Sequence, residues 1–185
     1  RDHPIELLIA NAGVASTIAS ASDWERRERI ASIVDTNFYG AINTVLPVID
    51  RMRERKRGRI AMMSSIAALR GMAISPAYCA SKAAIKAYGD SVRPLLGRDG
   101  IGVSIILPGF VETAMSDVFP GDRRFMWSAE RAAAYIRRKL DAGRTEIAFP
   151  EPLVLGMRLL PLLPAAIADA ILDRLSYVPR EVDSN

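Results

Sequence analysis

Tyr78 and Lys82 are the residues of this 185-residue chain whose types and spacing suggest chemistry most directly. They lie four positions apart in an Ala-rich segment of high helix propensity, so they share one face of a predicted helix and can meet a common ligand. A phenol with a pKa of about 10 is a poor acid–base group at neutral pH, but a lysine ammonium held nearby favours the phenolate and lowers that pKa. Taken alone, the pair also fits an aromatic residue on the core face beside a solvated lysine.

Two further polar residues precede this pair at compatible spacings. Ser65 lies at the end of a predicted strand, 13 residues before Tyr78, and Asn37 lies in a predicted helix, 28 residues before Ser65. Ser64 could compete with Ser65, but neighbouring residues of a strand point to opposite faces, so only one of them faces the same side as a given ligand.

The elements that must position these residues indicate an α/β protein with a parallel sheet. Short apolar runs bounded by turn residues predict buried strands over residues 5–10, 59–65, 101–107 and 145–149. Apolar spacing and helix propensity predict helices over residues 35–55, 77–96 and 128–140, and Ser22–Glu25 reads as one more helix start. Strands that alternate with helices and lack an apolar–polar alternation are typical of a parallel sheet.

Ligands bind such sheets at the carboxyl ends of the strands. Three of the four predicted strands end there in small or polar residues, namely Asn11-Ala12-Gly13, Ser64-Ser65 and Pro108-Gly109. We therefore expect the functional site along this one edge of the sheet.

These motifs, in this order, resemble the short-chain dehydrogenase/reductase family, whose signature is Tyr-x-x-x-Lys with an upstream Ser. The matching motifs run from Ile5 to Thr113, and the order of strands and helices matches to about Phe149. The resemblance implies the C-terminal portion of a Rossmann-like, doubly wound parallel sheet, with strands four to seven and their flanking helices. It also implies an NAD(P)-dependent oxidoreductase that interconverts a carbonyl and a secondary alcohol by hydride transfer.

The resemblance assigns roles to the candidate residues. Tyr78 is expected to exchange a proton with the substrate oxygen, while Lys82 lowers its pKa and binds the nicotinamide ribose. Family spacing selects Ser65 to hold and polarise the carbonyl or hydroxyl, and Asn37 is expected to order a water in the proton relay. The other expected cofactor contacts come from two loops, and they are Asn11, Ala12, Gly13, Pro108, Gly109, Val111 and Thr113.

The sequence departs from the family in one respect. The family's Gly-rich turn, Thr-Gly-x-x-x-Gly-x-Gly, does not occur in these 185 residues, nor does the residue that selects NAD or NADP, so the cofactor is expected to be either of the two. In the family, strands and helices of about 60–90 residues precede the strand at 5–10, which would here be an unprotected edge. We expect a fragment of a longer enzyme; the alternative is a truncated, non-catalytic α/β binding or scaffold protein derived from this family.

The sequence divides into two regions. Residues 1–150 are expected to form a partial Rossmann-like catalytic domain with the Ser-Tyr-Lys site. Residues 151–185 are expected to form an apolar extension that packs on the domain, at a subunit interface or at the substrate entrance, with a very apolar stretch at 152–164. The expected partners are a small carbonyl or alcohol substrate of hydrophobic character and further copies of the chain, as a homodimer or homotetramer.

The composition argues against several other classes of protein. The 25 Lys and Arg against 21 Asp and Glu give a net charge of +4, short of the dense basic surface of a dedicated nucleic-acid binder. No apolar run reaches the roughly 18–20 residues that span a bilayer. The sole cysteine, Cys79, cannot form an internal disulfide, and no cluster has the spacing of metal ligands, so we expect no metal site and a cytoplasmic location.

Overall fold

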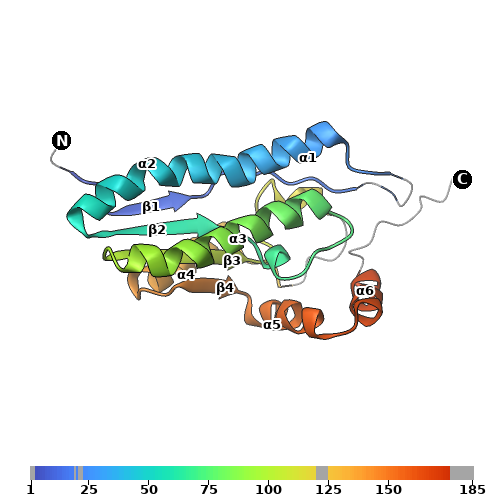
Figure 1. Cartoon of the computed structure of the whole chain (residues 1–185). Helices are drawn as coiled ribbons and strands as arrows, with labels where there is room; N and C mark the ends of the chain where they lie inside the picture. The colour runs from blue at the N-terminus through green and yellow to red at the C-terminus, as the bar shows by residue number, and fades with distance from the viewer. Residues whose placement is uncertain (1–2, 19, 21–22, 120–124, 176–185) are drawn as a thin grey trace, which may run out of the picture.

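The protein is a four-stranded parallel sheet with helices on both faces, as the sequence predicts (Figure 1). The computed structural model describes residues 3–18, 20, 23–119 and 125–175. The sheet has the order β1-β2-β3-β4, and its strands are β1 (Leu7–Ala10), β2 (Gly58–Met63), β3 (Ile101–Pro108) and β4 (Glu146–Phe149).

One face of the sheet is covered by two long helical segments. The first is a continuous run of α1 (Arg27–Val34), the π-helical turn η1 (Asp35–Tyr39) and α2 (Gly40–Arg55), and the second is α3 (Pro76–Gly97). Helix α4 (Ala129–Asp141) lies behind the sheet in Figure 1, on the other face.

The strands alternate their side chains between the two faces. In β3, Val103, Ile105 and Leu107 pack with the α2 and α3 side, whereas Ile106 packs with Trp127 and Leu140 on the α4 side. All four of these β3 side chains are buried, which explains why β3 reads as an unbroken apolar run.

Strand β1 is an edge of the sheet in the described residues and pairs with β2 alone. Its alternation buries Ala10 but leaves Leu7 and Ile9 each 44% exposed. Both side chains line the same cavity as Ile136 and Leu140 of α4. In the described residues β1 is thus an edge strand, as the sequence predicts, and its exposed side chains Leu7 and Ile9 lie on the α4 side.

The helix start predicted at Ser22–Glu25 is wrong. Ser22 lies outside the described residues, and α1 begins only at Arg27, after an extended Arg26. The acidic residues of the segment have other partners: the Asp23 carboxylate accepts from the Trp24 N–H, and the Glu25 carboxylate accepts from the N–H of distant Ala77. The helix predicted at 35–55 instead begins eight residues earlier and passes through residue 35 as a π-helical turn.

After β4 the chain forms α5 (Glu151–Leu159), the short turn η4 (Leu160–Leu162) and α6 (Ala165–Arg174). Val154, Met157 and Leu160 join the core beside Ile66. Residues 176–185 of the expected extension lie outside the described residues. Among the helices that the structure describes, none is long and apolar enough to cross a membrane.

Candidate functional site

The predicted site residues converge at the carboxyl edge of the sheet. All of them except Asn37 line one open cavity of about 1720 Å³, which extends from the exposed face of β1 to α5 and α6. Residues as far apart in the sequence as Asn11 and Thr113 thus line the same cavity. The convergence at this edge follows from the parallel sheet, because all four strands end there.

Helix α3 positions Tyr78 and Lys82. Pro76 occupies its first turn, where a missing N–H costs nothing. Tyr78 and Lys82 follow in the same helix, about one turn apart. Their exposed fractions are 8% and 2%, and the Lys82 Nζ lies 5.7 Å from the centre of the Tyr78 ring. The two side chains therefore share one face of the helix and reach the same cavity.

Lys82 is a buried amine held against the end of β2. Its Nζ donates a hydrogen bond to the Met63 carbonyl at 3.1 Å. Burial lowers the pKa of Lys82 to about 8, because the charged form loses its hydration. Most of the amine is still protonated at pH 7, so the site holds a positive charge inside an apolar helix–sheet junction.

Gly13 keeps the space in front of this ammonium open. A Cβ added at position 13 would stand 3.1 Å from Lys82 Nζ and 3.2 Å from Asn37 Oδ1. Any larger residue would therefore press on both polar groups. The loop after β1 approaches the site this closely because it carries no side chain here.

Ser65 and Tyr78 form the polar pair on the other side of the site. The Ser65 hydroxyl accepts from the Ala67 N–H at 3.1 Å, capping the short η2 turn (Ile66–Ala68), and donates to the Pro108 carbonyl at 3.4 Å. Burial raises the pKa of the Tyr78 phenol, while a hydrogen bond with Ser65 acts in the opposite direction. Burial is the largest of these effects, so the pKa lies above its usual value. The lowering by Lys82 that the resemblance implies stays a prediction.

Asn37 braces the site from the π-helical turn. Its Oδ1 accepts from the Val14 N–H at 2.7 Å, and its Nδ2 donates to the Val14 carbonyl and to Ser81 Oγ, both at 2.9 Å. The Ser81 hydroxyl in turn donates to the Tyr78 carbonyl at 2.8 Å. Asn37 thus ties the loop after β1 to the helix that carries Tyr78, and its water-ordering role stays a prediction.

Two supporting serines have clear partners. Both Ser64 and Ser65 line the cavity, but Ser64 is 2% exposed and its hydroxyl donates to the Lys82 carbonyl at 2.7 Å, which favours Ser65 as the serine that contacts a ligand. Sequence reasoning overlooked Ser81. A serine inside an Ala-rich helix is unfavourable unless its hydroxyl finds a specific partner, and this was the available signal.

The loop after β3 closes the site from the third side. Thr113 is exposed, and its N–H donates to Ser116 Oγ at 3.2 Å, which shapes the loop around the short η3 turn (Ser116–Val118). Phe119 packs edge-on against the Tyr78 ring with centroids 5.7 Å apart, and Phe110 packs on Phe119. Sequence reasoning overlooked these two aromatic residues, which keep water from the Tyr78 ring.

The titratable residues do not suggest a metal centre. In the part of the chain that the structure describes, no three His, Cys, Asp or Glu side chains lie close enough to hold a metal ion. The buried thiol of Cys79 points into a cluster with Met72 and Ile74, and burial raises its pKa.

Comparison with known proteins identifies relatives across most of the chain. A model of the family described as short chain dehydrogenase matches residues 2–123. An uncharacterized oxidoreductase of Myxococcus xanthus is 36% identical over 172 residues, which cover 92% of this chain and 67% of that protein. Retinol dehydrogenase 16 of Rattus norvegicus is 30% identical over 130 residues, 70% of this chain. The ketoacyl reductase HetN of a Nostoc species is 36% identical over 116 residues, 61% of this chain.

The chain spans only part of these relatives: 40% of the rat protein and 39% of the Nostoc protein are matched. Solved structures share the fold. A short-chain dehydrogenase from Burkholderia cenocepacia in complex with NADP superposes with a TM-score of 0.76 at 23% identity, over 92% of this chain and 70% of that one. One from Streptomyces avermitilis gives 0.70 at 20% identity, over 94% and 70%.

Proposed function

This chain belongs to the short-chain dehydrogenase family, and from that premise we propose that it carries the proton-transfer site of an NAD(P)-dependent oxidoreductase. The reaction would interconvert a carbonyl and a secondary alcohol. The observation that carries the proposal is the convergence of Ser65, Tyr78 and Lys82, from two different elements, on one cavity at the carboxyl edge of the sheet. The family relatives are named as oxidoreductases and dehydrogenases, which supports the same class of reaction.

In this proposal Tyr78 is the group that moves the proton. Its phenol and the Ser65 hydroxyl would both hydrogen-bond the substrate oxygen, which fixes the carbonyl between them. During reduction Tyr78 donates its proton to the oxygen as negative charge develops there, and during oxidation the phenolate takes that proton back. Because burial raises the pKa of Tyr78, the protonated form that serves reduction dominates at neutral pH.

The nicotinamide end of a cofactor fits the residues beside Lys82. Gly13 places no side chain against Lys82 Nζ, where a Cβ would stand only 3.1 Å away, so the ammonium stays free to bind the ribose hydroxyls. Asn11 and Ala12 after β1, and Pro108, Gly109, Val111 and Thr113 after β3, would line the rest of that end. When bound, the cofactor supplies or accepts the hydride at the carbonyl carbon. These 185 residues contain no Gly-rich turn for the phosphates, so nothing in them distinguishes NAD from NADP.

We further propose that the substrate is hydrophobic. Residues 151–175 supply part of the cavity lining through Leu153, Met157 and Leu160, and Phe119 lines the same cavity. Gly109 lets this part of the lining approach, because a Cβ there would stand 3.2 Å from Leu153 Cδ2. The rat relative's name contains retinol, an apolar alcohol, which supports the same substrate class.

We also propose that the complete protein is a homo-oligomer in the cytoplasm. Leu46 on α2 and Leu95 on α3 are 49% and 57% exposed on the outer side of the helical layer, where a second copy would bury them. Multi-angle light scattering of the complete protein would test this directly, since a monomeric mass would contradict it.

Replacing Tyr78 by Phe tests the function itself. The variant keeps the ring that packs on Phe119 but loses the hydroxyl, so we expect turnover to fall by about 100-fold or more while cofactor affinity is retained. The control is Tyr39→Phe, which removes a hydroxyl from an exposed tyrosine. Carbonyl reduction that survives in the Tyr78 variant would contradict the enzyme assignment and favour the non-catalytic scaffold.

A further inference from the structure

The first turn of α3 lacks the cap that its own sequence could provide. Ser75 occupies the N-cap position, but its hydroxyl donates to the Ser16 carbonyl at 2.6 Å and caps nothing. Pro76 follows and has no N–H. The first helix N–H that needs an acceptor is therefore that of Ala77, the residue directly before Tyr78.

Glu25 supplies that acceptor from 52 residues away. Its Oε2 accepts from the Ala77 N–H at 2.8 Å, and its Oε1 accepts from the Ser16 hydroxyl at 3.4 Å. The Ile18 N–H also donates to the Ile74 carbonyl at 2.8 Å. The segment between β1 and α1 is thus bonded at three points to the turn from which α3 begins.

We propose that Glu25 is a positioning residue of the Ser65–Tyr78–Lys82 site, and this proposal rests on the function proposed above. Its carboxylate fixes the first turn of α3, and Tyr78 is the third residue of that turn. A carboxylate on a helix N–H also has the favourable sign with respect to the helix dipole. Glu25 itself touches neither substrate nor cofactor: it acts through the backbone that carries the phenol.

Two other anchors hold α3 at residues that follow Ala77. Ser64 donates to the Lys82 carbonyl, and Ser81, bonded by Asn37, donates to the Tyr78 carbonyl. Both anchors remain when Glu25 is replaced, so the second turn with Lys82 stays in place while the first turn loses its cap. Proton transfer through Tyr78 should therefore suffer more than cofactor binding through Lys82.

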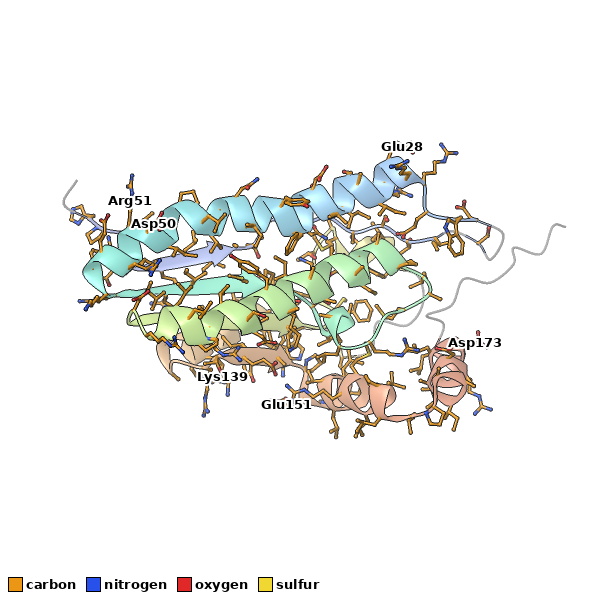
Figure 2. All side chains as sticks on the ribbon, in the orientation of Figure 1. Glu28, Asp50, Arg51, Lys139, Glu151 and Asp173 are labelled. Carbon is orange, nitrogen blue, oxygen red and sulfur yellow. The ribbon has the colours of Figure 1, made fainter. Side chains whose placement is uncertain are left out.

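Two replacements of Glu25 and one matched control test this in the complete protein. Glu25→Ala removes the acceptor, and we expect kcat to fall by about 10- to 100-fold, the cost of a small misplacement of a reacting group, with the cofactor KM within about twofold. Glu25→Gln keeps an oxygen for the Ala77 N–H and should recover most of the lost kcat. Glu28→Ala is the control, because Glu28 is exposed and lies on the outer side of α1 in Figure 2.

Hydrogen exchange gives a readout that does not depend on turnover. Glu25→Ala should speed exchange of the amides at the start of α3, in residues 77–80, and leave those near Leu96 unchanged. A lower Tm with unchanged kcat, or unchanged exchange at residues 77–80, would overturn the positioning role. A wild-type protein without carbonyl reduction would contradict the proposed function alone, and the exchange rates would still decide whether Glu25 fixes this turn.

Discussion

The carbonyl oxygen of Met63, the last residue of β2, accepts a hydrogen bond from Lys82 Nζ at 3.1 Å. This contact anchors a charged side chain from α3 at the carboxyl end of a central strand. It holds the amine in place but leaves it poorly hydrated, which is why the pKa of Lys82 falls to about 8. Lys82, which we propose to bind the cofactor, thus also destabilises the fold.

Replacing Lys82 by Met should increase the stability of the fold while weakening cofactor binding. An amine whose pKa is lowered on folding costs stability at all pH values below about 8, and that cost disappears as the pH rises toward 10.5. Wild-type unfolding free energy should therefore increase by roughly 3 kcal/mol between pH 8 and 10.5. Lys82→Met should lack this increase and be more stable at pH 7 by about 2 kcal/mol, after the loss of one hydrogen bond.

Urea unfolding at a series of pH values measures this difference. Lys86→Met is the matched control, because Lys86 lies one turn further along α3 and pairs with Asp90 at 2.7 Å. Replacing Lys86 should not increase the unfolding free energy at pH 7. A Lys82→Met protein less stable than wild type at pH 7 would contradict the argument. The same variant should bind nicotinamide cofactor more weakly.

Gly13→Ala should weaken cofactor binding without unfolding the chain. The added methyl group would press on Lys82 Nζ and on Asn37 Oδ1, and overfilling of a packed contact costs about 1–3 kcal/mol. We expect about a tenfold increase in the dissociation constant of NADPH or NADH, measured by fluorescence titration. Gly97→Ala is the control, since nothing lies within 4 Å of a Cβ at that position. Equal affinities of the two variants would contradict a cofactor ribose bound beside Gly13 and Lys82.

Asn37→Ala should destabilise the fold, since it removes the side-chain partner of the Val14 N–H and carbonyl and one of the two hydrogen bonds of the buried Ser81 hydroxyl. Each lost hydrogen bond costs about 0.5–1.5 kcal/mol, so a total of about 2–4 kcal/mol is expected for the three. Thermal unfolding would measure it against Asn43→Ala, in which an exposed asparagine of α2 is removed. If both variants unfolded at the same temperature, the bracing role of Asn37 would be wrong.

The sequence was sufficient to predict the sheet and the side chains that meet at its edge. Apolar runs bounded by turn residues and the 3.6-residue period of helices are local patterns, and parallel strands bring their carboxyl ends together whatever the intervening length. The role of Glu25 was not predictable in this way. Its acidic side chain near Asp23 resembled a local helix start, whereas its partner, Ala77, is brought close only by the folded sheet and α3. The same holds for Ser81 and Phe119.

The position of Lys82 relative to Tyr78 was predicted, but the burial of the phenol was not. Spacing placed both side chains on one face of a helix, which the structure confirms. Spacing contains no information on burial, and burial is the effect that raises the pKa of the phenol. Electrostatic consequences of a motif therefore depend on packing partners such as Phe119, which come from another segment of the chain.

The apolar wall of residues 151–175 predicts how the rate depends on substrate length. Each methylene that the wall removes from water is worth about 0.8 kcal/mol, so kcat/KM should rise by roughly fourfold per added CH₂ in a series of straight-chain ketones.

Leu163 lines the cavity and is 39% exposed, whereas its neighbour Leu162 is 77% exposed and lies outside the lining. Leu163→Asp should flatten the dependence on chain length, and Leu162→Asp should leave it intact. A rate independent of chain length in the wild-type protein would contradict the hydrophobic substrate. An equal effect of both aspartates would place the substrate elsewhere than against this wall.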